Sequence, residues 1–245
     1  MFDRVDGFVR EVGGLETEEA LAGALARVTL DLGYRYFALT HHVDVGRTRA
    51  AIRIHNYPRE WARWFDEQKL GQTDPVHRAS HMTSIGFPWS CLDRLIALSG
   101  RDREILEAAR EQGIGDGFTV PAHVPGEAHG SVSFAAGPGE GPDSATFPLM
   151  QLVGAFSFEA ARRIRRLREP PPLLPRLTER QRECVTWAAR GKSDWEISRI
   201  LGLSHETVIQ HLKEARERYG VPKRTLLTVH ALFDGTIAFF DVLRR

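Results

Sequence analysis

The sequence predicts an α+β fold, in which an α/β/α sandwich with an antiparallel sheet precedes an all-α domain of four helices. Residues 1–169 alternate between helical and strand periodicity, residues 170–175 are rich in proline, and residues 176–245 have helical periodicity throughout. Successive prolines fix φ and remove amide donors, so residues 170–175 are expected to form a stiff linker between two domains.

The first domain begins with a helical stripe from Leu21 to Leu32, which ends at Gly33. Alternating apolar residues predict strands, and Pro58 is expected to open a second helix. In order, the expected elements are strands at 34–43 and 50–57 joined by a turn at 44–47, a helix carrying Trp61 and Phe65, a helix at 101–112, strands at 117–124 and 130–136, a loop at 137–142 and a helix at about 144–168.

Helix boundaries in the second domain are marked by capping residues. Thr178 precedes Gln181, and Ser193 precedes Glu196, at the three-residue spacing of a capping box, in which each side chain bonds the other residue's amide. The glycines that are expected to end helices are Gly191, Gly202 and Gly220. These signals predict a compact bundle of four short helices.

Charge is divided unevenly between the two domains. Residues 1–161 carry 15 basic and 22 acidic side chains, a net charge of −7, whereas residues 176–245 carry 13 and 9, a net charge of +4. The basic domain is the one expected to meet a polyanion. The two cysteines are far apart in the sequence, which argues against a disulfide framework. The amino terminus lacks the apolar core of a signal peptide, and no apolar run is long enough for a membrane span. The sequence therefore predicts a cytoplasmic protein.

Residues 195–219 have the pattern of two helices joined by a tight turn at Gly202. In the second helix, Val208, Leu212 and Ala215 share one face and are expected to be buried, so the opposite face should meet base edges in the major groove. Nearby basic residues are expected to contact phosphates. The predicted DNA-contacting residues are Lys192, Ser204, Glu206, Thr207, Ile209, Gln210, Lys213 and Arg216.

The string from Leu177 to Ser198, continued by Thr207-Val208, His211-Leu212 and Tyr219-Gly220-Val221, closely resembles the LuxR-type DNA-binding domain. The resemblance implies binding to double-stranded DNA. The family usually has Glu, Leu and Asn at the positions where this chain has Gln181, Val185 and Glu214.

A second set of motifs lies in the first domain, where the acidic and lysine residues of a phosphorylated receiver are not found. The motifs are Asn56-Tyr57-Pro58-Arg59-Glu60-Trp61, Phe65, Asp74-Pro75-Val76, Phe87-Pro88-Trp89 and Gly113-Ile114-Gly115-Asp116-Gly117. In identity and spacing they resemble the autoinducer-binding domain of LuxR-type quorum-sensing regulators, over residues 5–165. The resemblance implies an N-acyl-homoserine lactone as the signal ligand, without a further cofactor. Such a ligand needs an apolar pocket with a few fixed polar groups.

The same resemblance implies a role for each ligand-binding residue. Trp61 would donate to the lactone carbonyl, Tyr57 to the acyl carbonyl, and Asp74 would accept from the ligand amide. Ser133 would offer a second hydroxyl, and Gly117 would permit close backbone approach. Trp89 would pack against the lactone, and Phe65 would pack against the acyl chain. The family usually has Tyr where Phe65 stands, and some members have Thr where Val76 stands, so this pocket is expected to be more apolar.

Other interpretations of these residues stay open at the sequence level. Trp61 and Phe65 could be ordinary core residues, and Asp74 before Pro75 could be a helix N-cap. His77 and His81, four residues apart, could bind a metal but lack an evident third ligand. The first domain could also be a small hydrolase or bind a partner protein, although no nucleophile and base set is recognisable.

Together these features predict a ligand-responsive transcriptional regulator and not an enzyme. A homodimer would place two recognition helices on the half-sites of a palindromic operator. If the protein is an activator, RNA polymerase is a further expected partner. The alternative is a LuxR-type regulator whose first domain binds a different small molecule or a protein.

Overall fold

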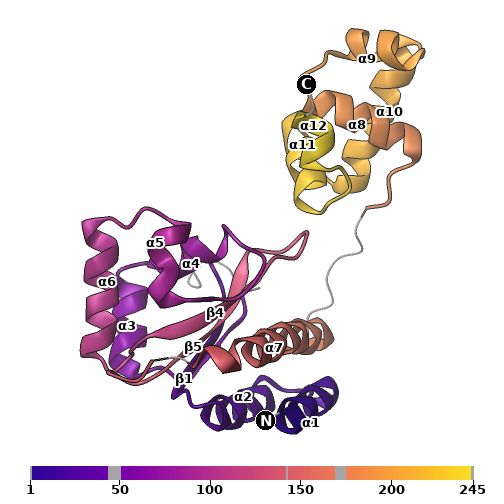
Figure 1. Cartoon of the computed structure of the whole chain (residues 1–245). Coiled ribbons are helices and arrows are strands. Elements are labelled where there is room, and N and C mark those ends of the chain that lie inside the picture. Colours follow the sequence, from indigo (N-terminus) through magenta and orange to yellow (C-terminus); the bar gives the residue numbers. More distant parts are fainter. Residues whose placement is uncertain (1, 44–50, 142, 169–174, 244–245) are drawn as a thin grey trace. The chain divides into compact units, whose positions relative to one another are not determined.

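The computed structural model describes residues 2–43, 51–141, 143–168 and 175–243. The turn expected at 44–47 and all of the expected proline linker except Pro175 lie outside the described residues. The chain divides into two compact units, the first ending with helix α7 (Phe147–Arg168) and the second beginning with helix α8 (Glu179–Ala189) (Figure 1). No helix in the described ranges is both long and apolar enough to cross a membrane.

The first unit is built on an antiparallel sheet with the strand order β2-β1-β5-β4-β3 among the described residues. The strands are β1 (Tyr36–His41), β2 (Arg53–His55), β3 (Phe87–Pro88), β4 (Gly117–Ala122) and β5 (Gly130–Ala135). In the central pairing Ala38 lies opposite Ser133, and Ala38 also lies opposite His55 on the other side. The antiparallel sheet between helices confirms the predicted fold class.

Alternation along the strands separates the two faces of the sheet. Phe37, Leu39, Val132 and Phe134 point to one face and are 0–1% exposed. This face packs against α1 (Phe2–Gly14), α2 (Glu18–Asp31) and α7. These helices are amphipathic and bury their apolar stripes in the main core of the unit.

Shorter helices cover the opposite face of the sheet (Figure 1). They are α3 (Arg59–Glu67), α4 (Pro75–Ser80), α5 (Leu92–Leu95) and α6 (Gly100–Glu111), and single 3-10 turns lie at Trp89–Cys91 and Ser144–Thr146. Helix α6 starts at a capping box formed by Ser99 and Asp102. On this face the strands present small or polar side chains, among them Ala38 and Ser133, which leaves room for a cavity.

The second unit contains, in its described part, α8, α9 (Asp194–Leu201), α10 (His205–Tyr219), α11 (Arg224–Phe233) and the short α12 (Phe239–Leu243). Both predicted capping boxes are present, and Gly202 and Gly220 end α9 and α10 in the left-handed conformation, with φ of 66° and 62°. The four predicted helices are therefore confirmed, and α12 is a fifth that the sequence pattern did not indicate. Val208, Leu212 and Ala215 are buried in the core of this unit, as predicted.

Candidate functional site

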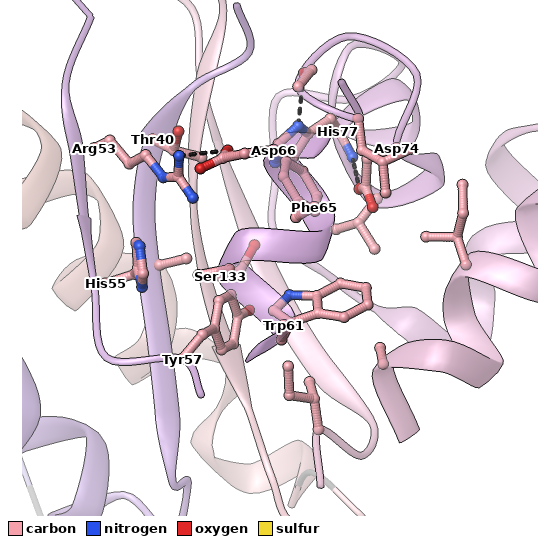
Figure 2. Close-up of a pocket in the computed structure, with 18 of the residues that line it drawn as sticks. Thr40, Arg53, His55, Tyr57, Trp61, Phe65, Asp66, Asp74, His77 and Ser133 are labelled. Carbon is pink, nitrogen blue, oxygen red and sulfur yellow. Dashed lines mark hydrogen bonds and ion pairs between the residues drawn. The ribbon is translucent and has the colours of Figure 1, made fainter. Parts of the chain in front are cut away.

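A cavity of about 460 Å³ lies between the sheet and helices α3, α4 and α6 of the first unit (Figure 2). Its volume is in the range of small-molecule pockets. Seven of the eight residues predicted to bind ligand line it: Tyr57, Trp61, Phe65, Asp74, Val76, Trp89 and Ser133. The sequence therefore identified residues from α3, α4, β5 and two connecting segments that the fold brings to one cavity.

Three polar groups of this cavity are available for a ligand. The indole N–H of Trp61 and the hydroxyl of Tyr57 have no hydrogen-bond partner among the described residues, although Trp61 is only 6% exposed. Burial, followed by the charge of Asp74, raises the pKa of Tyr57, so its hydroxyl remains a donor. Asp74 accepts the His77 amide through Oδ1 at 3.0 Å, which leaves Oδ2 for a second donor. Asp74 is thus an N-cap and a cavity residue at once.

A chain of hydrogen bonds holds Trp89 against the sheet. The indole N–H of Trp89 donates to Thr119 Oγ1 at 2.8 Å, and Thr119 Oγ1 lies 2.8 Å from Ser133 Oγ. Thr119 is fully buried, and the sequence analysis missed it because its importance depends on its place beside Ser133 across β4 and β5. These hydrogen bonds hold the Trp89 ring in place where it lines the cavity.

Gly117 does not line the cavity. A Cβ atom there would lie 2.8 Å from Trp89 Cε2 and 2.6 Å from the Phe134 carbonyl oxygen. The sequence led us to expect a close backbone approach at Gly117. The group that approaches this position of β4 closely is the Trp89 ring. Gly117 acts on the cavity through Trp89.

The apolar part of the cavity is formed mainly by aromatic and aliphatic side chains from α3 and α6. The Trp61 and Phe65 rings lie 6.0 Å apart, and Ile105 and Ile114 are part of the same buried cluster. Val76 packs in a neighbouring cluster with Phe87. Such a surface suits an acyl chain or another apolar group.

Several polar residues line the cavity around strands β1 and β2, and four of them were not singled out from the sequence. They are Thr40, Arg53, His55 and Asp66 (Figure 2). Arg53 donates to Asp66 at 2.5 Å. Arg53 and His55 lie two residues apart on β2, so alternation alone places them on the same face, but only the fold shows that a cavity covers this face.

A cluster of histidines lies beside the cavity. The rings of His42 and His77 stack at 3.9 Å, and His42 Nδ1 lies 2.9 Å from His81 Nε2. His129 and His123 contact His81 edge-on. Burial and then the neighbouring imidazoles lower the pKa of His42 well below its usual value and that of His81 to about 4. His42 and His81 are therefore neutral at pH 7. No group of three ligands in the described ranges has the arrangement of a metal site.

Seven of the eight predicted DNA-contacting residues lie on α10 or at its N-cap, and Lys192 lies just before α9 in the second unit. Ser204 caps α10 by accepting the amide of Thr207, and Lys192 pairs with Glu196 at 3.0 Å. Arg216 is half-buried and bonds the carbonyls of Leu212 and Pro222. The side chains that project into solvent are Glu206, Ile209, Gln210 and Lys213. Ile209 is 43% exposed, an unusual environment for an aliphatic side chain unless a partner covers it.

The two polar departures from the usual family pattern in this unit contact each other. Gln181 Nε2 donates to Glu214 Oε2 at 2.8 Å, while Gln181 Oε1 accepts the Thr178 amide. Gln210 donates to the other oxygen of Glu214 at 2.8 Å. These hydrogen bonds lower the pKa of Glu214 and hold it as a carboxylate. The Gln181 amide and the Glu214 carboxylate therefore form a hydrogen-bonded pair between α8 and α10.

Both units match known families. Residues 17–161 match the autoinducer binding domain, and residues 175–231 match the bacterial regulatory proteins of the luxR family. This chain belongs to the LuxR family. It is a quorum-sensing transcriptional regulator with an autoinducer-binding and a DNA-binding domain, and its family is one of regulators and not of enzymes.

Relatives and solved structures of the LuxR family support this assignment. The chain is 34% identical over 189 residues to the quorum sensing-dependent regulator RpaR of Rhodopseudomonas palustris, covering 74% of this chain and 73% of that one. It is 29% identical to the transcriptional activator LuxR of Aliivibrio fischeri, covering 83% and 82%. The crystal structure of Escherichia coli SdiA is similar over 97% of this chain and 99% of that one, with 25% identity and a TM-score of 0.67.

Proposed function

We propose that the first unit binds an N-acyl-homoserine lactone and that binding controls transcription at a palindromic operator. The observation that carries this proposal is the grouping of an unpartnered indole N–H, an unpartnered phenol and a carboxylate oxygen in one apolar cavity. The lactone and acyl carbonyls need donors, and the ligand amide needs an acceptor. Trp61, Tyr57 and Asp74 supply this set.

The ligand would stabilise the first unit by mass action. A cavity of this size lined by buried aromatic residues loses contacts when it is empty, so any ligand that binds only the folded state raises its stability. Trp89 and Phe65 would contact the lactone and the acyl chain, and Ser133 would offer its hydroxyl to the acyl part. Val76 adds apolar surface beside Asp74.

The second unit would read DNA as part of a homodimer. Leu226, Val229 and Phe233 on α11 are 41–55% exposed at three- and four-residue spacing, and Leu152 and Phe156 on α7 are exposed at four-residue spacing. Apolar stripes of this kind favour covering by a partner helix, and we assign them to a second copy of the chain. The DNA backbone would be contacted by Lys192, Ser204, Thr207 and Arg216. The base edges or nearby phosphates would be contacted by the exposed side chains Glu206, Ile209, Gln210 and Lys213.

The site of action we propose is the cytoplasm, where the operator lies. Several relatives are named as transcriptional activators, and contact with RNA polymerase would follow if this chain also activates.

A second candidate is an acylated ligand without a lactone. SdiA has been solved in complex with octanoyl-rac-glycerol, and that structure is 25% identical to this chain with a TM-score of 0.66. Hydroxyl groups of a glycerol could accept from Trp61 and donate to Asp74 in the same cavity. The two candidates share an acyl chain and differ in the head group.

Mass spectrometry of small molecules extracted from the purified protein tests both candidates. The chain would be produced with a panel of acyl-homoserine lactones, and in parallel with octanoyl glycerol. We expect one lactone to be retained at one molecule per chain, with loss in Asp74→Asn but not in Asp31→Asn, which changes an exposed carboxylate remote from the cavity. Retention of the glycerol and none of the lactones would favour the second candidate, and soluble protein without either would refute both.

A further inference from the structure

The cavity continues past its expected amide-binding part to the edge strand β2, and its far end is polar. Ser133 lies opposite Ala38, and Ala38 lies opposite His55, so these three residues form one row across β5, β1 and β2. Neighbouring strands are about 4.8 Å apart, which places the His55 backbone roughly 9–10 Å from that of Ser133. Arg53 and Thr40 form the next row on the same face.

The middle of this row is open because Ala38 has the smallest side chain on it. An extended ligand group could cross β1 above Ala38, between Ser133 and β2. The residues it would then meet are Thr40, Arg53, His55 and Asp66, all of which line the cavity (Figure 2). A plain alkyl chain in this position would cover polar groups without bonding them, which is unfavourable.

His55 presents a polar atom that needs a partner. Its Nδ1 is buried and has no hydrogen bond to any of the described residues. Burial, followed by the charge of Arg53, lowers the pKa of His55, so the ring is neutral at pH 7 and has one donor and one acceptor nitrogen. Because Nδ1 is enclosed, the ring offers its other nitrogen, Nε2, to a ligand oxygen in the cavity.

Arg53 adds donors and positive charge. Its guanidinium carries five N–H groups, and one of them bonds Asp66. The Arg53 side chain is 21% exposed whereas that of Asp66 is 54% exposed, so water screens the carboxylate more than the guanidinium. Lys69 also lines the cavity, and the ionic residues at this end therefore favour a group that accepts hydrogen bonds.

We propose that Arg53, His55 and Thr40 form a specificity subsite for a ligand whose acyl group carries an oxygen, as a hydroxyl, an oxo group or a carboxylate, in its distal part. The Thr40 hydroxyl donates to the His41 carbonyl and so remains an acceptor for a ligand hydroxyl. The proposal rests on the proposed acyl-lactone function and names the class of acyl group that the same cavity selects.

Isothermal titration with matched lactones tests the subsite. The probes are N-octanoyl-homoserine lactone and derivatives with one hydroxyl group at each carbon from the fourth to the eighth. We expect at least one hydroxylated probe to bind tenfold or more tightly than the octanoyl lactone. His55→Phe, which keeps an aromatic ring, and Arg53→Met should remove this preference while retaining the octanoyl lactone, which also shows that the variants fold.

The matched control is Arg59→Met, because Arg59 is exposed on α3 and does not line the cavity. It should keep the wild-type preference. Equal affinity of the wild type for the octanoyl lactone and all hydroxylated probes would overturn the subsite and leave the lactone function standing. Failure of every probe to bind would instead refute the proposed function.

Discussion

Replacement of Gly117 by alanine is expected to destabilise the first unit through Trp89. The new Cβ would lie 2.8 Å from Trp89 Cε2 and 2.6 Å from the Phe134 carbonyl oxygen, both well inside ordinary contact. The carbonyl belongs to β5 and is held in the sheet, so the indole and the strand must both shift. Shifting the indole strains its 2.8 Å hydrogen bond to Thr119.

The size of the effect follows from these two losses. Overpacking of this kind costs about 1–3 kcal/mol, and loss of one buried hydrogen bond costs about 1 kcal/mol more. A total of about 3 kcal/mol lowers the melting temperature of a unit of this size by roughly 6–12 °C. Lactone affinity should fall as well, because Trp89 walls the cavity.

Differential scanning calorimetry of the full chain measures this change. The control is Gly13→Ala, because Gly13 lies in α1 and a Cβ there meets nothing within 4 Å. Alanine is the better helix former, so this control should be at least as stable as the wild type. A Gly117→Ala protein that melts within 1 °C of the control would refute the close packing of Trp89 on β4.

Three further predictions concern other parts of the chain. Gln181→Glu should place two carboxylates side by side and speed hydrogen exchange of α8 and α10. The effect should exceed that of Gln210→Glu, because Gln181 is buried and Gln210 is exposed. Adding Glu214→Gln to Gln181→Glu should restore protection, and equal exchange in the two single variants would contradict this prediction. The pKa of His81 is lowered from 6.5 to about 4 in the folded chain, so His81 takes up a proton in the unfolded chain first as pH falls. The first unit should therefore lose stability between about pH 6.5 and pH 4. Calorimetry should show a weaker pH dependence of this stability in His81→Gln, and an unchanged pH dependence would contradict the prediction. Lys213→Ala should weaken operator binding and reduce its salt slope by about 1, and unchanged affinity at moderate salt would remove Lys213 from the contact surface.

Local chemistry explains which parts of the fold could be predicted from the sequence. The helix ends at Ser193, Gly202 and Gly220 follow from capping side chains and left-handed glycines, which depend on a few neighbouring residues. Helix α1 was missed although Val5, Phe8 and Val12 are spaced as a buried stripe. Strand β3 has two residues, too few to show alternation, and exists because it pairs with β4.

The candidate site divides in the same way. Tyr57, Trp61 and Asp74 were identified by resemblance, and the structure places them around one cavity. Thr119 and the histidine cluster could not be found this way, because their contacts join segments that lie far apart in the sequence. Arg53 and His55 were missed for a related reason, since nothing in a three-residue strand tells which layer will cover it.

We propose that occupation of the cavity controls operator binding. Its most direct test is the affinity of the full chain for a palindromic duplex selected from random DNA, measured with and without the retained ligand, in the wild type and in Asp74→Asn. We expect the ligand to change the affinity of the wild type for the duplex at least tenfold and to leave that of Asp74→Asn unchanged. A ligand that fills the wild-type cavity at one molecule per chain without altering the affinity for DNA would contradict it.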